Sequence, residues 1–243
     1  MNMMTSMAIP SIKCQSCSIN QLCLPVMLAE AEIEHLDSIV QRKKPLKKND
    51  MLFHAGDDFQ AIYAVRSGCI KSYTISESGE EQITGFHLPG EIIGLDAIDR
   101  NSHPSMAKAL ETSLVCTLPY TKLEMLSGEI AGLRQQLLRV MSREIHSDQE
   151  LLLLLNKKSA DERLAAFIMN LSSRYASRGL SRTCFNLVMT RGDVANYLGL
   201  AVETVSRLLT KLQKKDYISV KDKEITITNL KALSELAGSN CHH

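Results

Sequence analysis

The stretch Gly132–Leu155, GLRQQLLRVMSREIHSDQELLLLL, decides how the rest of the chain is arranged. Read as a helix, it carries seven residues at alternating four- and three-residue steps, the spacing of a two-stranded coiled-coil seam. These residues are Arg134, Leu138, Met141, Ile145, Asp148, Leu152 and Leu155. We therefore predict a dimerisation helix over residues 127–156. Its opposite face is expected to pack on the chain's own first domain through Leu133, Leu137, Val140 and Leu151.

Asp148 is the unusual member of this seam. In a parallel dimer it would face its own symmetry mate. Two exposed carboxylates at such spacing repel by roughly a few tenths of a kcal/mol, and by more when they are partly desolvated. One interpretation is that rotation of the helix turns Asp148 to solvent. The other is that the charge keeps dimerisation marginal, so that a small upstream event decides it.

The composition is that of a globular protein with room for two domains of about 100 residues each. Of the 243 residues, 44% are hydrophobic and 23% are charged. The longest evident apolar run, Leu151–Leu155, is far shorter than a membrane span. The N-terminus shows no charged segment followed by a long apolar core. We expect no signal peptide, no membrane partner and a cytoplasmic location.

Charge is distributed unevenly along the chain. Residues 157–243 contain 14 Lys and Arg against 8 Asp and Glu, a net charge of +6. Residues 1–156 contain 14 against 19, a net charge of −5. A basic C-terminal part favours a nucleic-acid partner at that end.

Residues 46–119 follow a period-two pattern, interrupted at intervals of about ten residues by turn-forming glycines. This pattern predicts an antiparallel sandwich or jelly roll. Ile62–Val65 and Gly68–Lys71 are expected to form one of its hairpins. A short amphipathic helix over residues 29–40 precedes the strands.

A winged helix-turn-helix is predicted after the long helix. Two capping boxes mark helix starts, Ser159 with Glu162 and Thr190 with Asp193. Gly199 then turns the chain into a second helix over residues 202–213. The segments 217–220 and 224–227 read as the hairpin of the wing.

The second helix of this unit has an outward face suited to DNA. Arg contacts guanine in a bidentate manner and Glu accepts from cytosine, while nearby cations hold phosphates. We assign DNA contacts to Glu203, Ser206, Arg207, Arg191, Thr190 and Lys211, with Thr210, Lys214 and Lys215 beside them. A dimer through the long helix would set two such helices about 34 Å apart, on a palindrome of double-stranded DNA. The alternative is a helical hairpin that packs against protein.

Seven cysteines are too unevenly spaced for a disulfide framework. Three are close together at Cys14, Cys17 and Cys23, and the others are Cys69, Cys116, Cys184 and Cys241. Three thiolates can converge on one centre, and a fourth is needed for tetrahedral zinc or a cubane iron–sulfur cluster. Spacing alone leaves zinc, a cluster and unliganded or redox-paired thiols open. It also leaves Cys69 and Cys184 open as the fourth ligand.

Four segments resemble the fumarate and nitrate reduction regulators (FNR) of the CRP–FNR superfamily. They are Cys14–Cys23 (CQSCSINQLC), Ile83–Leu88 (ITGFHL), Asp161–Phe167 (DERLAAF) and Val202–Arg207 (VETVSR). The similarity covers nearly the whole chain, from Cys14 to Gly238. It implies an α+β fold with an N-terminal antiparallel β jelly-roll sensor domain, a long dimerisation helix and a C-terminal winged helix-turn-helix. The corresponding divisions are a cysteine segment at 1–30, the β domain at 31–126, the helix at 127–156 and the DNA-binding domain at 157–243.

The resemblance implies a homodimeric regulator that senses oxygen. In that family three N-terminal cysteines and one in the β domain hold a [4Fe–4S] cluster, which corresponds here to Cys14, Cys17, Cys23 and Cys116. Oxygen converts the cluster to [2Fe–2S], the dimer loosens and DNA binding is lost. The family half-site is TTGAT, read by the residues at Glu203, Ser206 and Arg207. RNA polymerase is contacted through β-domain loops, and the Ser78–Glu80 turn lies where one such surface is expected.

Two positions depart from relatives in this superfamily. Those that bind cyclic AMP carry Arg-Ser-Ala after a Gly-Glu loop. Here Gly90-Glu91 is present, but Pro104-Ser105-Met106 stands at the second motif, so we expect no cyclic nucleotide. Ala201 stands where many relatives have a Ser or Thr cap, whose loss costs about 1 kcal/mol.

Two rival functions are compatible with parts of this pattern. A cyclic-nucleotide-responsive regulator of the same superfamily is disfavoured by Pro104. A protein with purely structural or metal-buffering thiolates would use the helix-turn-helix as a packing module. No nucleophile–base constellation or phosphate loop is evident, so we do not expect an enzyme.

Overall fold

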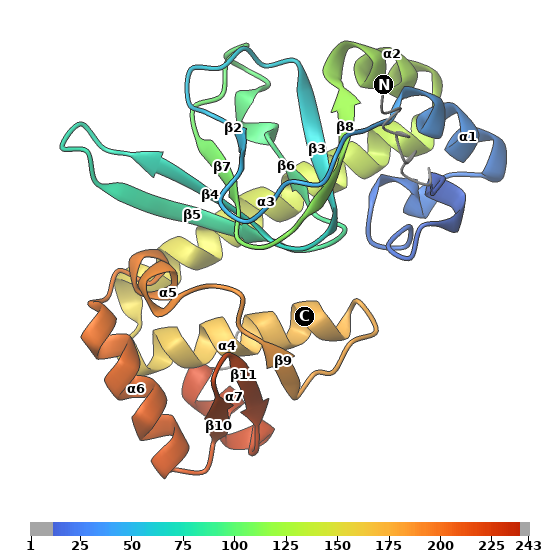
Figure 1. Cartoon of the computed structure of the whole chain (residues 1–243). Helices are drawn as coiled ribbons and strands as arrows, with labels where there is room; N and C mark the ends of the chain where they lie inside the picture. The colour runs from blue at the N-terminus through green and yellow to red at the C-terminus, as the bar shows by residue number, and fades with distance from the viewer. Residues whose placement is uncertain (1–11, 239–243) are drawn as a thin grey trace, which may run out of the picture.

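The computed structural model describes residues 12–238, and Cys241 lies outside this range. Figure 1 shows a β domain beside a short helical N-terminal segment, with a long helix running along it and a C-terminal domain at the far end of that helix. In the part of the chain that is described, no helix is long and apolar enough to cross a bilayer.

The N-terminal segment contains two 3-10 turns and one helix, η1 (Cys14–Ser16), η2 (Leu24–Met27) and α1 (Glu30–Ile39). The Glu32 carboxylate accepts the free N–H of Ala29 at 2.8 Å, which satisfies one of the unpaired donors at the start of α1. The predicted helix over 29–40 is therefore confirmed.

The β domain consists of two four-stranded antiparallel sheets, ordered β1–β8–β3–β6 and β2–β7–β4–β5. The elements are β1 (Gln41–Arg42), β2 (Met51–Phe53), β3 (Ala61–Ser67), β4 (Ile70–Ile75), β5 (Glu81–His87), β6 (Ile92–Ile93), η3 (Leu95–Ala97), β7 (Met106–Ala109) and β8 (Leu114–Pro119). Side chains from both sheets share one buried cluster, including Val65, Ile70 and Val115. This confirms the predicted antiparallel β sandwich.

The predicted hairpin between Ile62–Val65 and Gly68–Lys71 is wrong. β3 pairs with β8 and β6, whereas β4 pairs with β5 and β7, so the chain crosses from one sheet to the other at this turn. Gly68 has a φ of +82° and packs so closely that an added Cβ would lie 2.3 Å from Ser113 Oγ. A turn signal marks where the chain reverses but does not say whether the next strand pairs or crosses.

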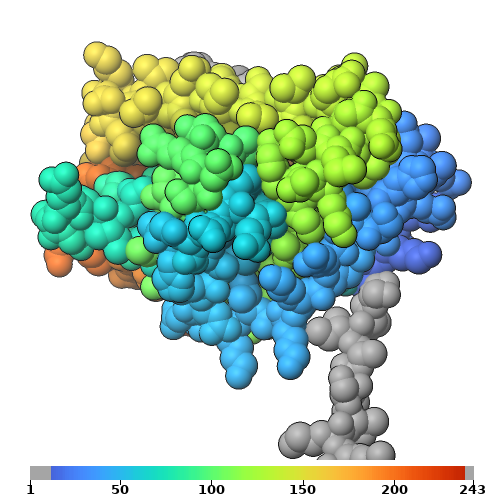
Figure 2. Space-filling view, turned by 90° about the horizontal axis from the view of Figure 1, so that it is seen from above, coloured from blue at the N-terminus to red at the C-terminus, as the bar shows by residue number. Residues whose placement is uncertain are grey.

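The long helix is α3 (Ala131–Lys157), and a separate helix, α2 (Tyr120–Glu129), precedes it. Its start is therefore four residues later than predicted. Leu133 is fully buried in one hydrophobic cluster with Leu36 of α1 and Leu123 of α2, and Leu137 and Val140 pack on the same cluster, as expected for the inner face. The seam faces outward, with Leu138 61%, Ile145 59% and Leu152 60% exposed. Figure 2 shows α3 extending along one side of the β domain.

The C-terminal domain is a winged helix-turn-helix, as predicted. Its elements are α4 (Ala160–Ala176), β9 (Cys184–Asn186), α5 (Arg191–Tyr197), α6 (Val202–Lys214), β10 (Ile218–Lys221), β11 (Glu224–Ile227) and α7 (Leu230–Ala237). Both capping boxes form, with Ser159 and Thr190 accepting from the third backbone N–H of α4 and α5. β9, which joins the wing as a third strand, and α7 were not predicted.

Candidate functional site

Four cysteines from distant parts of the chain line one pocket. Cys14 lies on η1, Cys17 and Cys23 lie between η1 and η2, and Cys116 lies on β8. The pocket is otherwise largely apolar, with lining from Ile19, Leu24, Leu36, Val40 and Leu118. Burial raises the pKa of Cys23 to about 12 and also raises the pKa of Cys14 and of Cys116.

The two cysteines that spacing left open as a fourth ligand are placed elsewhere. Cys69 is fully buried in the hydrophobic core, and Cys184 is exposed on β9 of the C-terminal domain. The structure therefore brings Cys116, and neither of these, to the three N-terminal thiols.

All four thiols line the same pocket. Among residues 12–238, no three Cys, His, Asp or Glu side chains are arranged to hold a single metal ion. A zinc ion requires its sulfur ligands at about 2.3 Å from one centre. A cubane cluster instead takes one thiolate at each of four iron corners. The donor set, four thiols around a largely apolar pocket, matches the four corner thiolates that a cubane cluster needs.

An acidic and a basic side chain flank the first of these thiols. The Asp37 carboxylate on α1 accepts the backbone N–H of Cys14 at 2.8 Å and pairs with the Arg42 guanidinium on β1. Arg42 also lies 3.8 Å from the Sγ of Cys14. Burial would raise the pKa of Asp37, but these hydrogen bonds outweigh it and lower that pKa.

The cysteine segment is in direct contact with the start of α3. Gln136 is 1% exposed, and its Nε2 donates to the carbonyl oxygen of Cys23 at 3.5 Å. On the same turn, a Cβ added to Gly132 would lie 3.1 Å from the carbonyl oxygen of Met27. The cysteine segment is therefore packed directly on the first turns of α3.

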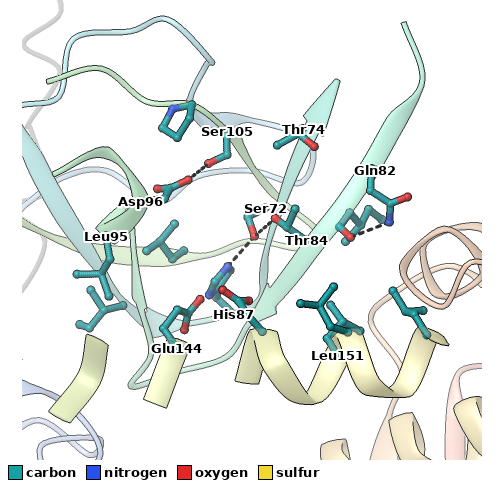
Figure 3. A pocket seen from close by; sticks show the side chains of 18 of the residues that line it. Ser72, Thr74, Gln82, Thr84, His87, Leu95, Asp96, Ser105, Glu144 and Leu151 are labelled. Carbon is teal, nitrogen blue, oxygen red and sulfur yellow. Dashed lines mark hydrogen bonds between the residues drawn. The ribbon is translucent and has the colours of Figure 1, made fainter. Parts of the chain in front are cut away.

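A separate cavity of about 540 Å³ lies between the β domain and α3. Figure 3 shows Glu144 and Leu151 of α3 facing His87, Asp96 and Ser105 across it. Its hydrogen bonds join His87 to Ser72 at 2.9 Å and Ser105 to Asp96 at 2.6 Å. Burial lowers the pKa of His87 to about 4, so the ring is neutral at pH 7. The cavity's acidic lining residues are Asp96, Glu144 and Asp148, and burial raises the pKa of Glu144 to about 7.

The predicted DNA-contacting residues lie together on α5 and α6. Glu203, Arg207 and Thr210 are exposed, and a hollow on this face is lined by Ser206, Arg207, Thr210, Lys211, Lys214 and Lys215. Arg191 at the start of α5 donates to Ser206 Oγ at 3.3 Å, which links the two helices at this surface. Lys211 pairs with Asp161 on α4 at 2.6 Å. Ala201 is the N-cap of α6 and has no side-chain acceptor, as predicted.

Glu91 joins the two domains. Its carboxylate accepts from Arg174 at 2.6 Å and from Arg178 at 2.6 Å, both on or just after α4. Burial alone would raise the pKa of Glu91, but the two guanidinium groups outweigh it and lower that pKa to about 2. The Gly90-Glu91 loop thus anchors the C-terminal domain to the β domain.

Replacing Glu91 with Gln is expected to lower the free energy of unfolding at pH 7 by about 2 kcal/mol, since charged hydrogen bonds are lost. The pKa of Glu91 is lower in the folded chain than its ordinary value of 4.5. Its contribution is therefore complete above pH 4.5 and lost as the pH falls toward 2. Urea denaturation of both proteins at pH 7 and pH 3 measures the difference, with the exposed-site variant E77Q as control. Equal midpoints for E91Q and E77Q at pH 7 would contradict the assignment.

Two family models match the chain, the cyclic nucleotide-binding domain over residues 43–129 and the Crp-like helix-turn-helix domain over residues 162–236. The anaerobic regulatory protein of Haemophilus influenzae is 60% identical over 230 residues, covering 95% of this chain and 90% of that protein. The chain belongs to the Crp/FNR family of transcription regulators. The fumarate and nitrate reduction regulatory protein of Escherichia coli strain K12 is 58% identical over 228 residues, with 94% and 91% covered.

Solved structures agree with this membership of the Crp/FNR family. FixK2 from Bradyrhizobium japonicum is 28% identical, with a TM-score of 0.75 over 82% of this chain and 97% of that one. The winged helix-turn-helix is thus the DNA-binding domain of a regulator, and the chain is not an enzyme. The rival in which this unit is only a packing module is wrong.

Sequence reasoning missed several residues around the site. Asp37 and Arg42 lie on elements with no motif of their own, and Gln136 lies between two predicted faces of α3. Arg42 lies opposite Cys116 because of the register between β1 and β8. The sequence of one strand does not determine which residue of another strand it will pair with.

Proposed function

We propose that this Crp/FNR regulator is a cytoplasmic homodimer that senses oxygen through a [4Fe–4S] cluster. Loss of oxygen favours the cluster-loaded dimer, which binds palindromic TTGAT-type DNA and contacts RNA polymerase. The observation that carries this proposal is the convergence of Cys14, Cys17, Cys23 and Cys116 on one pocket beside α3. The anaerobic regulatory names of relatives at 58–60% identity support it.

Cys14, Cys17, Cys23 and Cys116 would hold the cluster, which when bound supplies an iron–thiolate centre that oxygen degrades. The surrounding residues would hold the cluster in position and control access to it. The apolar lining from Ile19, Leu24 and Leu36 limits water, while Ser18 and Leu22 beside the ligands would tune access. The contacts of Gln136 and Gly132 with this segment give its position a direct route to α3.

The exposed seam of α3 is the surface proposed to form the dimer. Leu138, Ile145 and Leu152 form an apolar stripe that a second copy would bury. Asp148 interrupts it, so small changes in the rotation of α3 decide whether the two carboxylates are tolerated. In the dimer, two α6 helices would enter successive major grooves.

The other surfaces support the finer parts of the proposal. The turn at Ser78–Glu80, between β4 and β5, is exposed and accessible to RNA polymerase. The carboxylates of Asp96 and Asp148 would repel the phosphate of a cyclic nucleotide, and no Lys or Arg is among the described residues that line this cavity, so we propose none as ligand.

A mobility-shift titration on a TTGAT palindrome tests this function, with protein prepared without oxygen and then exposed to air. We expect binding without oxygen and its loss in air, with a scrambled site unbound throughout. Equal binding in both conditions would reject oxygen control while leaving the DNA-binding function intact.

Arg207 is expected to read the guanine of the half-site. Replacing it with Ala should reduce discrimination at that base by about 1–3 kcal/mol while leaving the iron content unchanged. Competition between the consensus site and a site changed only at the guanine measures the effect. K215A, which removes a nearby exposed cation, should weaken both sites alike. Unchanged discrimination in R207A would reject the assignment.

A further inference from the structure

Arg42 is placed between two of the four thiols by two independent features of the fold. On β1 it is the antiparallel partner of Cys116 on β8. At its other end, the guanidinium pairs with Asp37 and lies 3.8 Å from the Sγ of Cys14. One side chain thus connects a ligand of the N-terminal segment with the ligand supplied by the β domain.

One N–H group of the Arg42 guanidinium has no acceptor among the described residues. Its Nε is buried and has no hydrogen-bond partner within residues 12–238, and the side chain is only 18% exposed. A buried N–H without an acceptor costs free energy, so such a group usually faces something that accepts from it. None of the described residues that line the cysteine pocket carries a positive charge. Arg42, which lies beside Cys14, and Arg66 are the cations that act on Cys116, and Arg42 has the larger effect.

Four thiolates around an iron–sulfur core leave the whole site negative, and hydrogen bonds and net charge around the sulfurs set the properties of such a site. We propose, on the basis of the proposed cluster, that Arg42 is its countercharge and positioning residue. Asp37 holds the guanidinium in place, its positive charge offsets the thiolates of Cys14 and Cys116, and its free Nε–H is a donor toward the bound group.

Cluster retention tests the proposal directly. The wild type and the variants R42M, D37N and K43M are loaded with iron and sulfide without oxygen, and an iron chelator is then added. The visible absorption and the iron remaining are followed with time. R42M keeps the length of the side chain but not its charge, and is expected to lose iron about tenfold faster than wild type. K43M removes an exposed charge from the next residue and should match wild type.

The D37N variant distinguishes an electrostatic role of Arg42 from a purely structural role of the Asp37–Arg42 pair. The side-chain oxygen of Asn can still accept from the Arg42 guanidinium and the Cys14 N–H, so D37N keeps Arg42 in position and removes only the negative charge. If Arg42 acts through its charge, iron retention in D37N should therefore stay at or above the wild-type level. If the pair is only a brace between α1 and β1, D37N and R42M should lose iron equally fast, and the proposal is overturned. A single cooperative unfolding transition in each cluster-free protein shows that the variants fold.

Failure of the proposed function and failure of the role of Arg42 give different results. A wild type that takes up no iron and sulfide would reject the proposed function and this inference with it. A wild type that loads normally while R42M behaves like K43M would reject only the role of Arg42.

Discussion

Replacing Cys116 with Ser is expected to abolish cluster assembly and, with it, DNA binding without oxygen. Iron should fall from about four atoms per chain to well below one after anaerobic loading, because a cubane held by three thiolates lacks an anchor at one corner. Cys116 is the only one of the four on the β domain, so its loss also removes the thiolate through which the proposed cluster would link the N-terminal segment to β8. Iron and sulfide analysis with a DNA-binding titration measures both effects.

Cys184 offers a matched control for this variant. It is a free thiol on a strand, like Cys116, but is exposed on β9 in the C-terminal domain. C184S should load and bind DNA as wild type does. If C116S retains about four irons per chain, as the wild type should, the fourth ligand is another residue and the proposed ligand set is wrong.

Replacing Asp148 with Ala is expected to produce a dimer that binds DNA even in air. The change removes two facing carboxylates from the seam, where Leu152 and Ile145 are already exposed and apolar. Relief of about 1.4 kcal/mol or more would tighten the dimer at least about tenfold. Size-exclusion chromatography over a range of concentrations in air measures the shift.

E150A is the control for Asp148, because it removes a carboxylate from the same helix at a position outside the seam. It should stay monomeric in air, as the wild type should. A D148A variant that also stays monomeric would break the proposed coupling between the cysteine segment and dimerisation.

Most of the architecture could be predicted because local signals and spacing agree. The capping boxes at Ser159 and Thr190, the seam residues of α3 and the turn at Gly199 each specify geometry within a few residues. The hairpin at Gly68 could not be assigned correctly, because pairing depends on which sheet the next strand joins.

In the candidate site, too, local spacing identified some residues, and contacts between distant segments position the others. The three N-terminal cysteines were evident from spacing, and Cys116 came only from resemblance, since nothing in the strand around it distinguishes it from Cys69. The partners that hold the site, Asp37, Arg42 and Gln136, depend on register and packing between distant segments. The pairing of Glu91 with Arg174 and Arg178 is a further case, since this contact joins two domains and no local pattern indicates it.

The most direct test of the account is the visible absorption of the protein purified without oxygen, measured together with iron, acid-labile sulfide and zinc. A broad band at about 400 nm that bleaches in air, with about four irons and four sulfides per chain, is the predicted result. One zinc per chain, with no sulfide and no response to air, would contradict the oxygen-sensing site and leave a DNA-binding regulator with a different signal.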